Sequence, residues 1–293
     1  MEQTIDQTLA SGQTLVADGA TGTMLMAAGL PPGVAPELWN VKQPEQIIGL
    51  HRAYIDAGSQ IILTNTFGGS RIKLGKLGLA ERSRELNLAG AALARQAANG
   101  RAYVAGDLGP TGELMQPFGP LTFDRAVETF SEQAAALAEG GVDALWIETM
   151  TDLDEARAAV TGAHQATGLP VLCSLSFGRK GRTMMGVKAG QAAETLWPLG
   201  LAAVGANCGE GLDPVEEALR QMAEALPGVP LIAKPNAGLP KMVAGKTVYD
   251  VPADAFAIRL SKFATLGAKV VGACCGSNPE YIEAMTAALH SVA

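Results

Sequence analysis

The sequence predicts a single α/β domain over residues 1–293 with the fold of a (β/α)8 barrel, the TIM barrel, and three observations lead there. Eight short apolar runs alternate with longer amphipathic stretches along the whole chain. The apolar runs lack the polar alternation of half-exposed strands, which indicates parallel strands covered on their outer face. Eight strand–helix units in 293 residues match the size of this barrel class.

The eight expected strands are short and rich in Val, Ile, Leu and Ala. Periodicity alone does not show that a sheet closes, so a doubly wound open sheet is the alternative. The turn Asp18–Thr23 after the first strand lacks the G-x-G-x-x-G pattern of that alternative. The expected strands are Thr14–Ala17, Gln60–Leu63, Ala102–Gly106, Asp143–Ile147, Pro170–Leu175, Ala202–Ala206, Val229–Ala233 and Lys269–Gly272.

Between the expected strands, apolar residues recur at helical spacing. Residues typical of helix boundaries lie at the ends of these stretches. The clearest helices are Phe123–Gly140, Leu153–Thr167 and Asp213–Leu226, with Thr122 and Asp213 at helix starts and Gly140 and Gly168 after helix ends.

Composition excludes several classes of function. Hydrophobic residues make up 48% of the chain and charged ones 17%, so a large core is expected and disorder is not. The net charge is −7 and no Lys/Arg-rich block occurs, which argues against nucleic-acid or membrane partners. The N-terminus lacks the apolar region of a secretory signal, and no apolar run is long enough to span a bilayer. A cytoplasmic protein is expected.

Polar residues gather where the expected strands end, which is the catalytic end of this barrel class. One face of the barrel is therefore expected to be a functional site. The residues at these ends are Asp18, Thr64, Asn65, Asp107, Glu148, Ser174, Ser176, Asn207, Cys208, Pro235, Asn236, Cys274 and Cys275.

Three of the four cysteines, Cys208, Cys274 and Cys275, follow the sixth and eighth expected strands. These strands are near neighbours in a closed eight-stranded barrel, so their thiolates are placed to converge on one metal. Sulfur ligands indicate Zn²⁺, and three protein ligands leave an open position, as in catalytic sites. Buried inert cysteines are the alternative, but the position at strand ends favours the metal.

Three thiolates give a zinc site a net charge of −1, which acidifies a bound water poorly. A substrate thiol in the open position would instead bind as a nucleophilic thiolate. This chemistry suits alkyl transfer to sulfur better than hydrolysis. His51 and His164 lie in expected helices and His290 near the C-terminus, so all three are expected at the surface or packed with their hydrogen bonds satisfied.

A thiol-bearing amino acid also needs its ammonium and carboxylate held. Glu148 and Asp18 are the expected ammonium acceptors, because each follows an apolar run. Backbone N–H groups of the Gly-rich turns Asp18–Thr23 and Phe67–Ser70 are candidates for holding the carboxylate. Asp107 is as consistent with a purely structural role in the turn that follows it as with a role in the functional site.

Six segments together resemble the homocysteine S-methyltransferase family, over about residues 12 to 290. The Asn-Cys and Gly-x-Cys-Cys-Gly segments are the most specific. The six are Asp18–Thr23 (DGATGT), Leu63–Gly68 (LTNTFG), Gly109–Gly112 (GPTG), Ile147–Thr149 (IET), Gly205–Cys208 (GANC) and Gly272–Gly276 (GACCG).

The resemblance implies a (β/α)8 barrel in which zinc, held by Cys208, Cys274 and Cys275, activates homocysteine to give methionine. It implies that Glu148 and Asp18, with backbone near Gly19, bind the amino end of homocysteine. Thr64 and Asn65, in the segment that matches after the second strand, are also expected at the substrate. Cys173 matches no ligand and is expected in the core.

Members of this family use betaine, S-methylmethionine or methylcobalamin charged by methyltetrahydrofolate. The chain stops at Ala293, just after the eighth expected helix, whereas cobalamin-dependent members carry further domains. A small onium donor, betaine above all, is therefore expected, with Trp39 and Phe67 as its aromatic contacts. Asn236 is expected near the substrate, where it would fill the open zinc position when no thiol is bound.

Other readings stay open. The segment Lys234–Pro240 resembles the cobalamin-dependent barrels, which would make this a stand-alone homocysteine-activating barrel served by a cobalamin-carrying partner. A lyase or aldolase with Lys234 as Schiff-base amine leaves the three cysteines unexplained. A non-catalytic module that binds zinc and a thiol amino acid is the third alternative.

Overall fold

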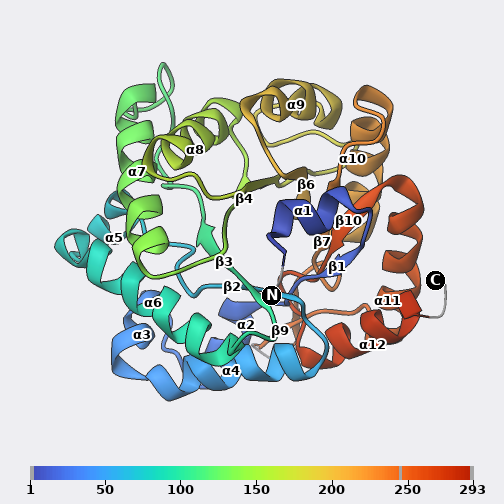
Figure 1. Ribbon diagram of the computed structural model, residues 1–293, viewed down its shortest axis with the longest axis horizontal. Coiled ribbons are helices and arrows are strands. Elements are labelled where there is room, and N and C mark those ends of the chain that lie inside the picture. Colours follow the sequence, from blue (N-terminus) through green and yellow to red (C-terminus); the bar gives the residue numbers. More distant parts are fainter. Residues whose placement is uncertain (1–2, 244–245, 291–293) are drawn as a thin grey trace.

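Eight parallel strands form a barrel in the computed structural model, which describes residues 3–243 and 246–290 (Figure 1). The strand order is β1-β10-β7-β6-β5-β4-β3-β2. A parallel bridge between Ala17 and Ile61 joins the two end strands, which confirms the barrel over the open sheet. The strands are β1 (Leu15–Val16), β2 (Ile61–Leu63), β3 (Tyr103–Leu108), β4 (Ala144–Met150), β5 (Val171–Leu175), β6 (Ala203–Cys208), β7 (Leu231–Pro235) and β10 (Ala268–Val271).

Four strands continue past the ends expected from the sequence. Asp107 lies within β3, Glu148 within β4 and Cys208 at the end of β6, so the expected strand ends were wrong there. The cause is the parallel ladder, which continues through the pairs Asp107–Trp146 and Cys208–Pro235. These polar side chains are thus held by the sheet itself and not by loops.

Helices surround the barrel, and the helix boundaries test the expected caps. Thr122 is the N-cap of α7, because its hydroxyl accepts a hydrogen bond from Arg125 N at 3.2 Å. Asp213 was wrongly expected as a cap: Gly211 is the N-cap of α10, and Asp213 lies in the first turn. The helices after the barrel strands are α2 (Thr21–Ala27), α3 (Trp39–Lys42), α4 (Pro44–Asp56), α5 (Arg71–Gly75), α6 (Ser83–Ala98), α7 (Phe123–Glu139), α8 (Leu153–Ala166), α9 (Ala189–Leu196), α10 (Leu212–Ala225), α11 (Ala253–Phe263) and α12 (Pro279–His290), with 3-10 turns Pro36–Leu38, Ala80–Arg82, Trp197–Leu199 and Ala264–Leu266.

The hydrophobic core has two parts, as the alternation of side chains along a barrel strand requires. One part fills the barrel interior and includes Trp146 and Leu172, while the larger part lies between the strands and the helices. Helix α1 (Ile5–Ala10) closes the amino end of the barrel: Ile5 and Leu9 join the interior cluster, and Thr8 hydrogen-bonds the Tyr103 hydroxyl at 2.8 Å. The site is therefore confined to the opposite end.

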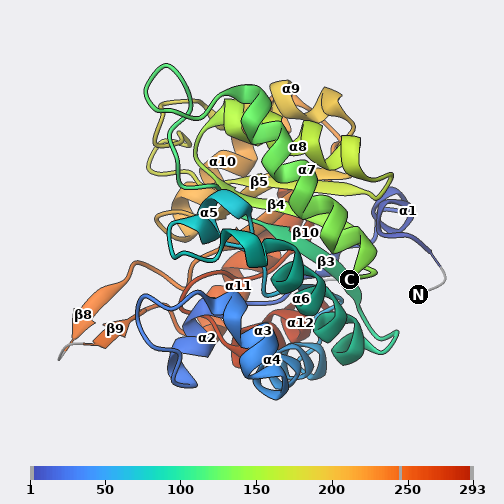
Figure 2. The same cartoon turned by 90° about the vertical axis from the view of Figure 1, so that its left-hand side faces the viewer.

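An antiparallel hairpin of β8 (Lys241–Val243) and β9 (Lys246–Val248) follows β7 and projects from the end opposite α1 (Figure 2). The sequence analysis did not predict it, because its few residues lie between two strand–helix units and carry little apolar pattern. In the part of the chain that the structure describes, no helix is both long and apolar enough to cross a membrane.

His51 differs from the expectation that the histidines are exposed or hydrogen-bonded, because it is buried and its ring nitrogens lack hydrogen-bond partners among the described residues. Its side chain in α4 is 1% exposed, and neither ring nitrogen has a hydrogen-bond partner among the described residues. Burial lowers the pKa of His51 to about 4. The imidazole is therefore neutral at pH 7, and protonating it requires a charge inside the core.

The protein should lose stability in acid through His51. Because the folded-state pKa of His51 lies below the usual 6.5, its contribution is intact above pH 6.5 and is lost as the pH falls towards 4. Between pH 7 and 4 the wild type should lose about 3 kcal/mol of unfolding free energy that His51→Leu does not lose. Urea denaturation across this range measures it. His164→Gln, at an exposed position, is the control; parallel profiles for wild type and His51→Leu would contradict the expectation.

Candidate active site

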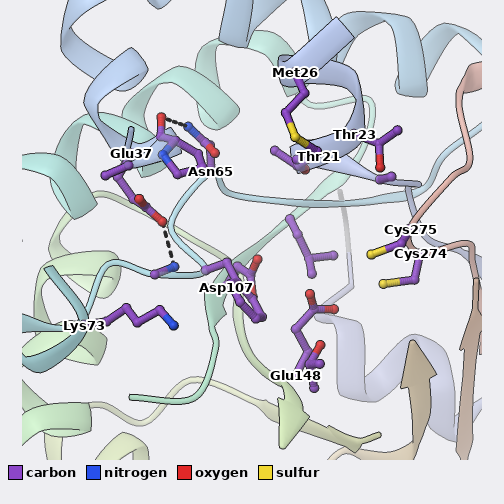
Figure 3. Close-up of a pocket in the computed structure, with 18 of the residues that line it drawn as sticks. Thr21, Thr23, Met26, Glu37, Asn65, Lys73, Asp107, Glu148, Cys274 and Cys275 are labelled. Carbon is purple, nitrogen blue, oxygen red and sulfur yellow. Dashed lines mark hydrogen bonds between the residues drawn. The ribbon is translucent and has the colours of Figure 1, made fainter. Parts of the chain in front are cut away.

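A pocket of about 610 Å³ opens at the carboxyl end of the barrel strands (Figure 3). In this view the Cys274 and Cys275 sulfurs lie at one end, Glu37 and Lys73 at the other, and Asp107 and Glu148 between them. The lining includes the turn from Gly19 to Thr23, the segment after β2, and residues of β3, β4, β6, β7 and the loop after β10. The end predicted from the polar residues at strand ends is thus the end that carries the pocket.

The three cysteines expected to bind a metal converge at one end of this pocket. The sulfurs of Cys208, Cys274 and Cys275 all lie within 4.8 Å of one another, and those of Cys208 and Cys275 are 4.0 Å apart. Cys173 is fully buried in β5 and belongs to the core, as expected. Burial raises its pKa to about 12, so its thiol is unreactive.

Proximity makes the three thiols poor acids on their own. The hydrogen bond with Cys208 raises the pKa of Cys274 well above its usual value, and burial adds to this effect. Three adjacent sulfurs therefore ionise together only when a cation joins them. A metal ion that binds thiolates fits this donor set, and Cys274 is buried while the other two are partly accessible from the pocket.

Backbone contacts fix the thiol positions. Cys274 N donates to Pro235 O at 2.8 Å, and Ser277 Oγ donates to Cys274 O at 2.8 Å. Gly276, at φ +84°, lies so close to the Tyr249 ring that a Cβ there would meet it at 2.1 Å. Cys208 itself adopts φ +58°, which is uncommon for a residue with a side chain and is typical of functional sites.

A hydrogen-bonded chain orients Glu148. Trp146 Nε1 donates to Ser174 Oγ at 3.1 Å, and Ser174 Oγ donates to Asn207 Oδ1 at 2.8 Å. Asn207 Nδ2 then reaches Glu148 Oε2 at 3.4 Å and Thr149 Oγ1 at 2.7 Å. Thr149 is held at φ +61°, a strained value for a β-branched residue. Glu148 is thereby aimed into the pocket with 6% of its surface exposed.

Asp18 is buried behind the pocket wall and is not among the described residues that line the pocket. Its Oδ2 accepts a hydrogen bond from Leu63 N at 2.8 Å, and Lys234 Nζ lies 3.4 Å from its Oδ1. Burial raises the pKa of Asp18 to about 6, while Lys234 opposes this rise. The neighbouring Gly19 does line the pocket; a Cβ there would lie 2.7 Å from Ser277 Oγ.

Lys234 is the site residue whose partners the sequence did not reveal. Its ammonium lies between Asp18 and Glu148, 3.7 Å from Glu148 Oε2, and 5.9 Å from the centre of the Trp146 ring. Burial lowers the pKa of Lys234, but the charges of Glu148 and Asp18 raise it well above its usual value. A permanently protonated amine is a poor Schiff-base nucleophile, which weakens the lyase or aldolase alternative.

The two residues expected at the substrate after β2 line the pocket, whereas the one expected after β7 does not. Thr64 and Asn65 line the pocket, with the Thr64 hydroxyl accepting from Asp107 N and the Asn65 amide donating to Pro36 O and Asn40 Oδ1. Asn236 donates to Gly209 O at 2.8 Å, and its buried Oδ1 has no hydrogen-bond partner among the described residues. Asn236 does not belong to the described pocket lining.

Only one of the two aromatic side chains expected to contact the methyl donor lies in the pocket. Phe67 lines it, and a Cβ at Gly109 would lie 2.5 Å from the Phe67 ring. Trp39 is not among the described lining residues and packs instead against the core between strands and helices. Tyr249, which the sequence analysis did not consider, supplies a second aromatic ring to the lining.

The sequence also did not predict the charged groups at the end of the pocket away from the cysteines. Glu37 is 3% exposed, accepts from Gly68 N at 2.7 Å, and has its pKa raised by burial. Lys73 and Lys76 line the same end, where a Cβ on Gly112 would lie 3.1 Å from either ammonium. These lysines lie in and just after α5, a region where the sequence shows no polar residue at a strand end.

Comparison with known proteins gives one family. The model of the family described as homocysteine S-methyltransferase matches residues 15–289. Methionine synthases of Mycobacterium tuberculosis (strain ATCC 25618 / H37Rv) and Mycobacterium leprae (strain TN) are 33% and 32% identical, over 96% and 97% of this chain. The alignments cover 25% of each relative, so the chain spans about a quarter of the length of these curated relatives.

Solved structures with the same fold include the homocysteine methyltransferase MmuM from Escherichia coli. Its oxidized form has a TM-score of 0.78 at 25% identity, over 96% of this chain and 98% of that chain. Its metallated form has a TM-score of 0.80 at 24% identity, with the same coverage.

Removing the Lys234 ammonium should destabilise the protein strongly. Lys234→Met leaves Asp18 and Glu148 buried without a cation, which should cost about 3–5 kcal/mol of unfolding free energy. Asp18→Asn added to Lys234→Met should restore part of the loss, because it removes one of the two charges. Urea denaturation of the metal-free protein measures both effects.

The matched control is Lys241→Met, which breaks the exposed ion pair with Asp250 and should change stability little. If Lys234→Met were as stable as Lys241→Met, the buried ion pairs would not hold the pocket floor together.

Proposed function

We propose, because this chain belongs to the homocysteine S-methyltransferase family, that it transfers a methyl group to the thiol of homocysteine and forms methionine. The resident metal in this proposal is Zn²⁺, held by Cys208, Cys274 and Cys275. The observation that supports it most is the convergence of these three sulfurs at one end of a pocket that also carries carboxylates.

The donor set fits zinc. Sulfurs in a tetrahedral site with bonds of about 2.3 Å lie about 3.8 Å apart, close to the 4.0 Å between Cys208 and Cys275. Three cysteines leave one position for a substrate atom, as in catalytic zinc sites. When bound, the metal supplies the Lewis acid that lowers the pKa of the homocysteine thiol while leaving its sulfur nucleophilic.

The protein's own groups hold the rest of homocysteine. Glu148 points into the pocket and accepts the α-ammonium, with Asp18 acting on the same charge cluster from behind the wall. Backbone N–H groups near Gly19 are placed for the carboxylate, since the turn from Gly19 to Thr23 lines the pocket. Thr64 and Asn65 border the same space.

The transfer itself needs alignment more than acid–base chemistry. The homocysteine sulfur forms a bond to the donor methyl carbon as the bond from that carbon to the leaving atom breaks, and the thiol proton leaves for solvent. No general base acts at the methyl group. The pocket contributes by fixing the sulfur in line with the donor and by excluding water with apolar side chains such as Leu63 and Phe67.

Betaine, or another small onium compound, is the first donor candidate. Phe67 and Tyr249 offer aromatic faces for a quaternary ammonium. Two features favour the alternative of a methylcobalamin donor delivered by another domain or protein. Trp39 is absent from the described lining, and the lysines Lys73 and Lys76 at the far end repel a cation. The relatives named methionine synthase are also about four times longer than this chain.

Cysteine replacement tests the metal. Cys274→Ala should abolish retention of zinc after dialysis and reduce methionine formation to background, because two sulfurs do not complete the site. Cys173→Ala is the matched control: it removes a buried thiol of the core and should keep both metal and activity. Metal content by mass spectrometry and methionine by chromatography are the readouts. Full activity of zinc-free Cys274→Ala would refute the mechanism.

A panel of methyl donors tests the reaction. The zinc-loaded protein is given homocysteine with betaine, S-methylmethionine, dimethylsulfoniopropionate or methylcobalamin, and methionine is measured. Turnover with betaine would support the small-onium donor, and turnover with methylcobalamin alone would support the carried donor. Tight binding of homocysteine without turnover by any donor would favour the non-catalytic module that binds zinc and a thiol amino acid.

A further inference from the structure

The floor of the pocket carries more buried negative groups than positive ones. Asp18, Asp107 and Glu148 are 1%, 6% and 6% exposed, and Lys234, at 3%, is their one buried ammonium among the described residues. Three carboxylates face one lysine, and burial together with the charge of Glu148 raises the pKa of Asp107 well above its usual value. A further cation in the pocket would favour the ionised form of Asp107. Because buried charges are paired in stable proteins, the bound ligand is expected to bring that cation.

Lys234 divides the three carboxylates into two groups. Both carboxylate oxygens of Asp18 have partners within the protein. Oδ2 accepts a hydrogen bond from Leu63 N at 2.8 Å, and Oδ1 lies 3.4 Å from Lys234 Nζ. Glu148 shares Lys234 through Oε2 at 3.7 Å and also lines the pocket. Asp107 has no ion pair within 4.0 Å among the described residues, so it is the carboxylate that Lys234 leaves unpaired.

Asp107 is also placed to meet a ligand. Its backbone is pinned on both sides: its N–H donates to the Thr64 hydroxyl at 3.0 Å, and its carbonyl accepts from the Thr66 hydroxyl at 2.8 Å. Its side chain lines the pocket, and the buried Oδ1 has no hydrogen-bond partner among the described residues. An unpaired buried acceptor of this kind destabilises the protein without ligand, and a ligand cation would offset that cost.

We propose that Asp107 is a substrate-binding residue that accepts the α-ammonium of the thiol amino acid, together with Glu148. Lys234 is then a positioning residue: it pairs with Asp18 and Glu148 and leaves Asp107 as the unpaired carboxyl group. This inference rests on the proposed function and changes its assignment, because the resemblance to the family gave the ammonium to Asp18 and Glu148. It also gives Asp107 a role that turn chemistry alone does not explain.

The test compares homocysteine with 4-mercaptobutyrate, which has the same thiol and carboxylate but no α-amino group. Binding of each thiol to the zinc-loaded protein is measured by calorimetry, without any methyl donor, alongside the zinc content. A charge-assisted hydrogen bond is worth about 1.5–3 kcal/mol, so Asp107→Asn should weaken homocysteine binding by about 10- to 150-fold. Binding of 4-mercaptobutyrate and zinc content should not change.

Glu37→Gln is the matched variant, because it alters another buried carboxylate of the pocket lining, at the end away from the cysteines. It should keep the preference for homocysteine over 4-mercaptobutyrate. The inference is overturned if Asp107→Asn weakens both thiols equally, or if it leaves the preference unchanged. If the wild-type zinc protein binds neither thiol, the proposed function fails as well, which separates the two failures.

Discussion

The seam where the barrel closes supports both the fold and the site. Gln60 N donates to Val16 O at 2.7 Å and Asp18 N to Ile61 O at 3.0 Å, and these bonds join the first and second strands. The Asp18 side chain extends this pairing to Leu63 N, and on its other side it meets Lys234, two strands away across β10. A carboxylate therefore links three strands at the end where the cysteines converge.

Charge is distributed unevenly along the pocket, and this orients a zwitterionic substrate. Asp107 and Glu148 lie between the cysteine end and the far end, where Lys73 lies (Figure 3). An amino acid whose sulfur lies among the cysteines has its ammonium within the acidic floor. The cationic groups at the far end are then left for the other reactant, or for a carboxylate on either one. In the proposed function, the pocket would thus separate two reactants of different charge by electrostatics as well as by shape.

Much of the fold was predictable because it depends on local patterns. Apolar runs and helical spacing identified all eight barrel strands, and strand order then placed Cys208 near Cys274 and Cys275. Strand ends were less predictable, since pairing such as Cys208–Pro235 is set by a neighbouring strand and not by local sequence. The same reason hid the partners of Lys234, which come from the turn after β1 and from β4. Trp39 shows a limit of sequence inference: an aromatic contact with the donor was expected, but the side chain packs against the core.

Asn207 connects Cys208 with Glu148, the two residues to which the proposed function assigns the thiol and the ammonium of homocysteine. It directly precedes Cys208, and its side chain donates to Glu148 and Thr149 while accepting from Thr149 N and Ser174. Cys208 and Thr149 both hold positive φ values, each of which costs on the order of 1–3 kcal/mol. Strain at two facing strand ends, bridged by one amide, indicates that the sulfur position and the ammonium acceptor are fixed relative to each other. In the proposed function, a rigid separation of this kind would select the length of the chain between thiol and amine, because an amino acid with one methylene fewer would not reach both ends.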